Sequence, residues 1–421
     1  MVSKFDTVIG YQAIKRELLE ICDMIKNPDI YKKLGATMPR GIMLHGEPGV
    51  GKSMMANAFL DECGLTSYTL RRTKSDGDFI NEIKQIFNDA AANEPSVILL
   101  DDMDKFVSEE GRQEEFSVVQ ACIDEVKDKQ VFVIATANST RDMPSSLTRA
   151  GRFDRKIEVK IPSRQDAVDI VHYYLKGKTL SEDVDFTDVA KMMSRKSCAE
   201  LEGVINEAAI YAGFERSEKV CMRHLVRAFL RTYFRSSEAE PWEQLDEKKR
   251  KKLAYHEAGH AAVAELLKPN SVGIISIHSG IEFATKGFVG MCERIENDED
   301  QIALSLAGKV ASEMMLGEID EGAFRDIERA IYMIREELCD SGLYGMELVT
   351  HFKEDMSETK HVLQENCIKS ELERQKYRVM KLLTEHRTFF DLIAKELMQK
   401  ETLMYSDMQR IRKEYFNDKD W

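Results

Sequence analysis

The fold is decided near the start of the chain by Gly41-Ile42-Met43-Leu44-His45-Gly46-Glu47-Pro48-Gly49-Val50-Gly51-Lys52-Ser53. Its largely apolar beginning predicts a short buried strand. The stretch from Gly46 to Ser53 matches G-x-x-x-x-G-K-[ST], a pattern whose glycines turn backbone N–H groups inward around phosphates. Met54 to Leu60 then predicts a helix whose N-terminus faces the same phosphates. This order of strand, loop and helix predicts a nucleotide site on a parallel α/β sheet.

Each part of the loop has an expected role in binding ATP. Lys52 is expected to reach the β- and γ-phosphates, and the Ser53 hydroxyl to bind Mg²⁺. The candidate nucleotide-binding residues of this stretch are Gly46, Glu47, Pro48, Gly49, Val50, Gly51, Lys52, Ser53 and Met54.

Two further apolar runs predict neighbouring strands that end in polar residues. Val97–Leu100 is followed by Asp101 and Asp102, and Val131–Thr136 is soon followed by Asn138. We expect Asp101 to hold Mg²⁺ through water, and Asp102 to position the water that attacks ATP. Asn138 is a candidate to touch the γ-phosphate or that water.

A second chemistry is indicated by His256-Glu257-Ala258-Gly259-His260. Residues four apart lie on one face of a helix, so both imidazoles can bind one zinc ion. Glu257 lies beside that metal, where it can take a proton from a bound water. The third ligand is left open by spacing alone, because His278, His351, His361, His386 and several downstream acids are all available.

Composition narrows the class of protein. The 421 residues are enough for two or three domains, and the net charge of −14 argues against general nucleic-acid binding. The eight cysteines include no C-x-x-C pair, which favours a reducing compartment. The sequence has neither a signal peptide nor an apolar run long enough to cross a bilayer. We therefore expect a cytoplasmic protein that does not insert into a membrane by itself. Tethering to a membrane through a partner is left open.

The stretch Leu147-Thr148-Arg149-Ala150-Gly151-Arg152-Phe153-Asp154-Arg155 completes a familiar order of motifs. With the preceding motifs, it resembles an AAA+ ATPase. Followed by H-E-A-G-H, the chain resembles the FtsH-type ATP-dependent zinc metalloproteases from Phe5 to about Phe416. The resemblance implies that Arg152 and Arg155 are arginine fingers acting on the ATP of a neighbouring subunit in a homo-hexameric ring. The competing interpretation is that these arginines form local ion pairs.

The resemblance also implies a fold class and its boundaries. An α/β P-loop AAA+ ATPase domain with a helical lid is expected to precede a mostly helical zinc metalloprotease domain. The boundaries are residues 1–161 for the large ATPase subdomain, 162–235 for the lid, 236–247 for a linker and 248–421 for the protease domain.

Further site residues follow from matching positions in the family. Ile9 and Gly10 correspond to adenine contacts, and His172 and Ala199 to lid contacts with the nucleotide. Asp326 corresponds to the third zinc ligand, with Glu328 as a second choice for that role. The stretch 287–290 corresponds to a strand whose edge pairs with the substrate.

The chain departs from the family at four points. We expect no membrane-spanning helices before its ATPase domain. Asp102 replaces the usual Glu, and Cys198 replaces a Gly. The stretch Arg71–Phe79 lacks the aromatic–apolar–Gly triplet of the central pore loop, and its Arg71, Arg72 and Lys74 instead suggest a preference for acidic substrates.

The leading hypothesis is a zinc endopeptidase whose hexameric ring uses ATP and Mg²⁺ to unfold polypeptides and move them inward. The alternative is an AAA+ remodelling or assembly factor with limited or peptide-only proteolysis. A third hypothesis is a peptidase whose ATPase part only builds the ring.

Overall fold

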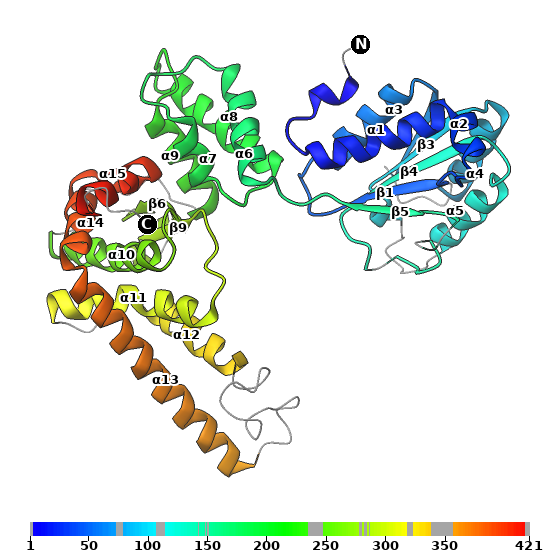
Figure 1. Ribbon diagram of the computed structural model, residues 1–421. Helices are drawn as coiled ribbons and strands as arrows, with labels where there is room; N and C mark the ends of the chain where they lie inside the picture. Colours follow the sequence, from blue (N-terminus) through cyan, green and yellow to red (C-terminus); the bar gives the residue numbers. More distant parts are fainter. Residues whose placement is uncertain are drawn as a thin grey trace. The chain divides into compact units, whose positions relative to one another are not determined.

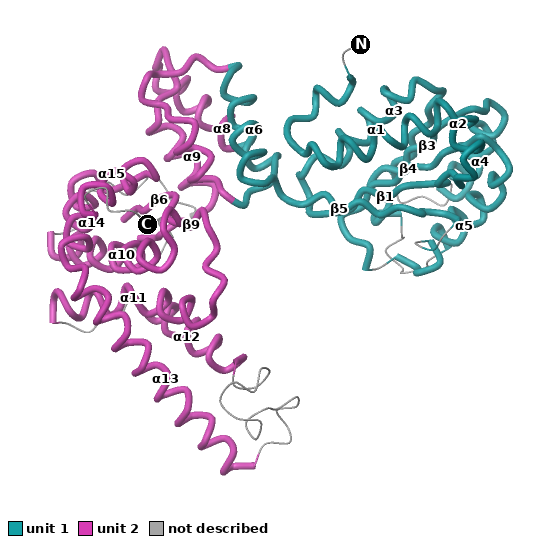
Figure 2. The backbone as a smooth tube through the Cα atoms, viewed as in Figure 1, with its two compact units in different colours: residues 1–177, 195–203 teal, residues 178–194, 204–421 magenta. Residues whose placement is uncertain are grey.

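The computed structural model describes residues 3–72, 79–106, 114–141, 143–147, 149, 151–234, 247–277, 280–281, 284–285, 287–317, 323–337 and 357–416, with only the backbone at 234, 280, 281, 284 and 285. The chain forms two compact units (Figure 2). Unit 1 comprises Met1–Gly177 and Arg195–Gly203, and unit 2 comprises Lys178–Ser194 and Val204–Trp421. The expected linker, 236–247, lies outside the described residues except for Glu247.

Unit 1 is a parallel sheet with helices packed around it (Figure 1). Its elements are η1 (Lys4–Thr7), α1 (Gln12–Lys26), α2 (Pro28–Lys33), β1 (Gly41–His45), α3 (Lys52–Cys63), β2 (Thr66–Arg71), α4 (Phe79–Ala92), β3 (Ser96–Asp101), η2 (Met103–Phe106), α5 (Glu114–Glu125), β4 (Val131–Ala137), β5 (Arg155–Glu158), α6 (Arg164–Lys176) and the first residues of α8 (Cys198–Phe214).

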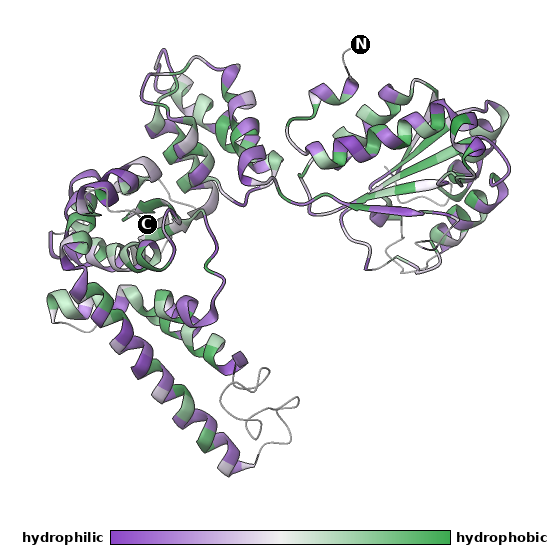
Figure 3. Ribbon diagram, viewed as in Figure 1, coloured by the Kyte–Doolittle hydropathy of each residue, from purple (hydrophilic) through white to green (hydrophobic). Residues whose placement is uncertain are grey.

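The strand order in unit 1 is β2-β3-β4-β1-β5, and every pairing is parallel. The three strands expected from apolar runs are β1, β3 and β4, and together they form the centre of the sheet. They are buried because helices cover both faces of a parallel sheet. In Figure 3 these central strands are coloured hydrophobic, whereas β5 is largely hydrophilic. The carboxyl ends of β1, β3 and β4 therefore bring the predicted polar residues to one edge.

Unit 2 is mostly helical, and its described residues also form a three-stranded and a two-stranded antiparallel sheet. Its elements are α7 (Phe186–Met192), the rest of α8, α9 (Met222–Phe234), α10 (Glu247–Leu267), β6 (Val272–Ser276), β7 (Gly280–Ile281), β8 (Ala284–Thr285), β9 (Phe288–Met291), α11 (Asp298–Leu316), α12 (Phe324–Glu336), α13 (Glu358–Glu385), α14 (Arg387–Lys400), β10 (Thr402–Met404) and α15 (Tyr405–Phe416).

Helices α10 and α11 form the centre of unit 2 and pack closely because small residues face each other. A Cβ at Gly259 would lie 2.4 Å from Ala311 Cβ and 2.8 Å from Ala307 O. Helix α13 packs on this pair, and Ile368, Val379 and Leu383 of its apolar stripe are buried in the same core, with Leu372 partly buried against it.

The segment expected to be a lid, 162–235, contributes to both units. Helix α6 belongs to unit 1, whereas α7, α9 and most of α8 belong to unit 2. Among the described residues, no helix combines the length and apolar character that crossing a bilayer requires.

Candidate functional site

The phosphate loop between β1 and α3 has the backbone that its glycines predict. Gly49 has φ of 79° and Gly51 has φ of 96°, in the left-handed region that favours glycine. A Cβ at Gly46 would lie 2.0 Å from Val159 O, so only glycine fits at the start of the loop. The glycines therefore give the loop the fixed bend that a phosphate site requires.

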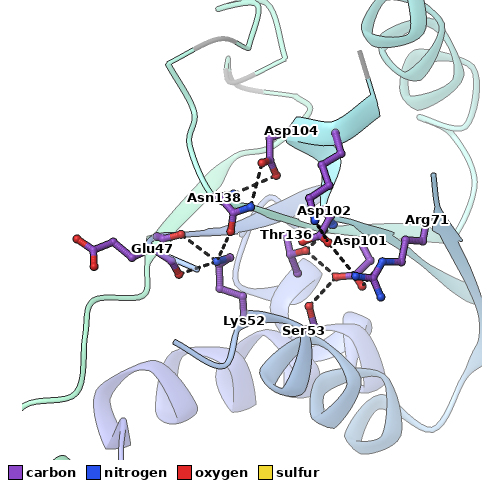
Figure 4. A network of polar contacts seen from close by, with 11 residues as sticks. Glu47, Lys52, Ser53, Arg71, Asp101, Asp102, Asp104, Thr136 and Asn138 are labelled. Atoms are coloured by element: carbon purple, nitrogen blue, oxygen red, sulfur yellow. Dashed lines mark hydrogen bonds and ion pairs between the residues drawn. The ribbon is translucent and has the colours of Figure 1, made fainter. Parts of the chain in front are cut away.

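Lys52 lies over this loop with its ammonium held by oxygen atoms (Figure 4). Its Nζ donates hydrogen bonds to Gly46 O, Glu47 O and Asn138 Oδ1, each at 2.9 Å. The side chain is buried, and burial lowers the pKa of Lys52 despite the carboxylates nearby. Sequence reasoning named Lys52, Glu47 and Asn138 separately, and the structure brings all three together.

The expected Mg²⁺ ligands also meet. Ser53 Oγ donates to Asp101 Oδ1 at 2.8 Å, and Thr136 Oγ1 donates to the same oxygen at 2.7 Å (Figure 4). Oxygen atoms of this kind are the ligands that Mg²⁺ prefers. Thr136 was not predicted, although it lies at the end of a predicted strand, which was the available signal.

Asp102 is held by two cations. Its Oδ2 accepts hydrogen bonds from Arg71 Nη2 at 3.0 Å and from Lys105 Nζ at 2.8 Å, and its backbone has φ of 55°. Burial acts to raise the pKa of Asp102, but the two cations outweigh burial and lower it. The two cations therefore favour the ionised form of this carboxylate.

Asn138 is oriented by a residue that the sequence analysis missed. Its backbone N and its Nδ2 both donate to the carboxylate of Asp104, each at 3.0 Å. This contact turns Asn138 Oδ1 toward Lys52 (Figure 4).

The residues expected to contact adenine or to belong to the lid differ in burial and in their contacts with the phosphate loop. Gly10 is buried with φ of 74°, and Ile9 beside it is half-buried. Ala199 N donates to Gly49 O at 3.0 Å, so the start of α8 lies on the phosphate loop. By contrast, His172 on α6 and Met54 on α3 are exposed.

The candidate arginine fingers are paired within unit 1. Arg152 forms hydrogen bonds of 3.1 and 2.7 Å with the carboxylate of Asp124, and Arg155 Nη1 lies 3.7 Å from Glu17 Oε1. These contacts are the local ion pairs of the competing interpretation. They do not test a role toward a neighbouring subunit.

The residues at the two ends of the expected pore loop make contacts within their own unit. Residues 73–78, including Lys74, lie outside the described residues. Arg71 pairs with Asp102, and Arg72 Nη1 lies 3.2 Å from Glu115 Oε1. Phe79 is buried, with its ring 4.9 Å from that of Phe106. Phe79 is thus a core residue, and the two arginines already face acids of their own chain.

The zinc motif lies in the middle of α10, and α12 brings Asp326 to it. His256 Nε2 is 3.2 Å from Asp326 Oδ2, and His260 Nε2 is 3.6 Å from the same oxygen. Ligand atoms of these three residues lie within 4.8 Å of one another. Burial acts to raise the pKa of Asp326, but hydrogen bonds to both histidines hold it well below its usual range.

The other candidates for the third ligand do not join this group among the described residues. Glu328 and His361 are exposed, and His386 Nδ1 lies 3.2 Å from Tyr415 OH. His278 and His351 lie outside the described residues.

Helix α11 shapes the space for a metal ion. A Cβ at Gly308 would lie 2.4 Å from His260 Nε2 and 2.5 Å from His256 Nε2, so glycine leaves the ligand nitrogens uncovered. His260 Nδ1 donates to Leu304 O at 2.8 Å, which leaves Nε2 of a neutral ring as the metal-binding atom. Two imidazoles and a carboxylate with room between them fit zinc.

Glu257 is buried next to the strand expected to bind substrate. A Cβ at Gly287 would lie 2.3 Å from Glu257 Cγ, and β9 begins at the next residue. Strand β9 ends the sheet order β10-β6-β9. The expected base, the candidate metal ligands and an outer strand thus lie together, as a peptidase site requires.

Comparison with known proteins places both sites in one family. Residues 42–161 match the ATPase family associated with various cellular activities (AAA), and residues 243–411 match Peptidase family M41. The ATP-dependent zinc metalloprotease FtsH of Lachnoclostridium phytofermentans is 32% identical over 443 residues, covering 97% of this chain and 74% of the relative. The chain belongs to the FtsH family of ATP-dependent zinc metalloproteases.

Other FtsH relatives match over a similar extent. FtsH 3 of Symbiobacterium thermophilum is 29% identical over 444 residues, covering 96% of this chain and 70% of its own length. FtsH of Helicobacter pylori is 27% identical over 458 residues, covering 98% of this chain and 71% of its own length. As a member of the FtsH family, the chain is an ATP-dependent zinc metalloprotease, with Zn²⁺, ATP and Mg²⁺ as cofactors.

Proposed function

We propose that this FtsH-family protein is a zinc endopeptidase whose homo-hexameric ring hydrolyses ATP to unfold polypeptides and deliver them to the zinc site. The observation that carries the proposal is the meeting of Asp326 with His256 and His260 in a chain that also carries an assembled phosphate loop. Membrane insertion and nucleic acid have no part in the proposal.

The peptidase chemistry is assigned to residues of α10, α12 and β9. His256, His260 and Asp326 would hold a zinc ion, which would supply a Lewis acid and lower the pKa of a bound water to about 7. Glu257 would act as the general base toward the attacking water and would return the proton to the leaving amine. The outer edge of β9 pairs with the substrate backbone beside Gly287.

The ATPase chemistry is assigned to the loop residues and their neighbours. Lys52 binds the β- and γ-phosphates, while Ser53 and Asp101 provide oxygen ligands toward Mg²⁺. Asp102 orients the attacking water, and Asn138 contacts that water or the γ-phosphate.

The decisive experiment compares wild type with Glu257→Gln and Lys52→Ala, on a short peptide and on a folded protein, with ATP and zinc. A general base contributes roughly 10²- to 10⁴-fold, so Glu257→Gln should lose at least about 100-fold in cleavage of both substrates. Lys52→Ala should lose cleavage of the folded protein alone. Equal cleavage by wild type and Glu257→Gln would refute the zinc mechanism.

The arginine-finger assignment has its own test. Arg152→Ala should lower the ATPase rate of the assembled ring by roughly 10³-fold or more if Arg152 acts on the ATP of a neighbour. Arg387 also forms an exposed ion pair, at 2.8 Å from Asp391, and Arg387→Ala is the matched control. An unchanged ATPase rate in Arg152→Ala would contradict a role toward a neighbouring subunit and would leave the local ion pair with Asp124 as the role of Arg152.

The alternative function, a remodelling factor with limited proteolysis, is favoured by one observation. Phe79, the sole aromatic of the stretch Arg71–Phe79, is 4% exposed and so does not project to grip a chain. Unfolding of a tagged folded protein without peptide products would support this alternative.

A further inference from the structure

Strand β9 is supported at both of its ends by helices that precede the protease part in sequence. As an outer strand it pairs only with β6 among the described residues, so one of its backbone edges has no neighbouring strand. Such a strand needs other contacts to keep its position. Its position matters because Gly287, immediately before it, lies against Glu257.

The first support comes from α9. The ring of Phe229 lies 6.2 Å from that of Phe288, the first residue of β9, at an interplanar angle of 37°. Phe229 is 4% exposed, and the ring of Tyr233 packs 5.0 Å away. Two aromatic rings at such a distance attract each other beyond the area they bury.

The second support comes from the end of α7 and the turn after it. Ser194 Oγ donates to Cys292 O at 3.1 Å, and Cys292 directly follows β9. Lys191 Nζ lies 3.8 Å from Glu293 Oε1. Helix α7 is itself fixed, because the buried Asp188 accepts hydrogen bonds from Ser406 N at 2.8 Å and Ser406 Oγ at 2.6 Å.

We propose that Phe229 is a positioning residue for peptide-bond hydrolysis, acting through Phe288. Its ring fixes the beginning of β9, and β9 in turn fixes Gly287 beside Glu257. The same contact holds the free edge of β9 ready for substrate, which is the part that rests on the proposed function. A helix of the segment expected to be an ATPase lid thereby forms part of the peptidase site.

The test measures kcat and KM for a short peptide that needs no unfolding, at saturating ATP and zinc. Phe229→Ala should raise KM about two- to tenfold, because the lost contact is that of one aromatic pair. The change should fall mainly on KM, since backbone pairing is made before the chemical step. ATP hydrolysis and zinc content should not change, and Phe229→Tyr, which keeps an aromatic ring at this position, should restore most of the loss.

Two comparisons separate positioning from general damage to α9. Leu225→Ala removes a fully buried side chain one turn earlier on the same helix and should leave KM near that of wild type. In a double-mutant cycle, Phe229→Ala should add nothing in a Phe288→Ala background, because both remove the same contact. An unchanged KM in Phe229→Ala, an equal rise in Leu225→Ala, or additive effects would overturn the proposal.

The failure of this proposal is distinguishable from failure of the proposed function. If Glu257→Gln cleaves the peptide as fast as wild type, the zinc mechanism itself fails. If Glu257→Gln is inactive and Phe229→Ala resembles wild type, only the positioning role fails.

Discussion

Replacing Gly308 by Ala should weaken zinc binding in an otherwise folded protein. The added Cβ would lie 2.4 Å from His260 Nε2 and 2.5 Å from His256 Nε2. Restoring a contact of 3.0 Å requires the His260 ring to retreat by about 0.6 Å, whereas zinc–ligand distances vary only within about 0.2 Å. Both ligands are displaced together, so we expect zinc affinity to fall by about 100-fold, or about 2.7 kcal/mol.

The assay is competition for zinc against a chelator of known affinity, with peptide cleavage and ATP hydrolysis measured on the same sample. Gly203→Ala is the matched control, since a Cβ at Gly203 would meet no atom within 4 Å. Gly308→Ala should lose zinc and peptide cleavage together while ATP hydrolysis continues. If Gly308→Ala bound zinc as tightly as wild type, the space assigned to the metal between α10 and α11 would be wrong.

Three further outcomes follow from other contacts. A zinc-selective chelator should stop peptide cleavage while ATP hydrolysis continues, and loss of both rates would contradict separate sites. Arg412→Ala leaves the buried carboxylate of Glu265 without the cation 3.1 Å away, so the free energy of unfolding should fall by about 3–5 kcal/mol, measured by urea denaturation against Arg387→Ala. A hydrogen bond with His224 lowers the pKa of Glu215, and nearby cations lower it further. The ionised Glu215 therefore stabilises the fold at pH values above its unfolded pKa of about 4.3. This stabilisation is lost as the pH falls through the lower pKa of the folded state. The gap in melting temperature between wild type and Glu215→Gln should therefore shrink between about pH 5 and about pH 3. A gap that widened over this range would contradict the expected direction.

Sequence patterns located the centre of the sheet in unit 1 because a buried parallel strand must be apolar along its length. The same reasoning missed β2 (Thr66–Arg71) and β5 (Arg155–Glu158), which form the two sides of the sheet. Both strands contain many polar residues, because an outer strand of a sheet is partly exposed to solvent. In β5 the sequence Arg-Lys-Ile-Glu carries no apolar run at all.

The three residues of the candidate metal site were identified by two different routes. His256 and His260 follow from helical spacing, but Asp326 required a family resemblance because no spacing rule links it to α10. Gly308 and Leu304 could not be found by either route. Their roles depend on α11 packing against α10, and that contact exists only in three dimensions.

The ion-pair partners of charged residues also could not be identified from the sequence. Glu265 and Arg412 form a buried pair although 147 positions separate them in the sequence. Arg71 and Arg72 looked like free cations of a basic loop, yet each faces an acid from another element. Charge is visible in a sequence, whereas its compensation is set by the fold.

The contacts of α7 and α9 in unit 2 determine which fragments of this protein are worth preparing. A fragment beginning at Glu247 would retain the zinc ligands, yet it would uncover Phe288 and remove the partner of Ser406. A fragment beginning at Lys178 would keep those surfaces covered and should stay monodisperse at concentrations where the shorter one aggregates. The boundary useful for crystallisation or inhibitor screening therefore lies well before the zinc-binding helix.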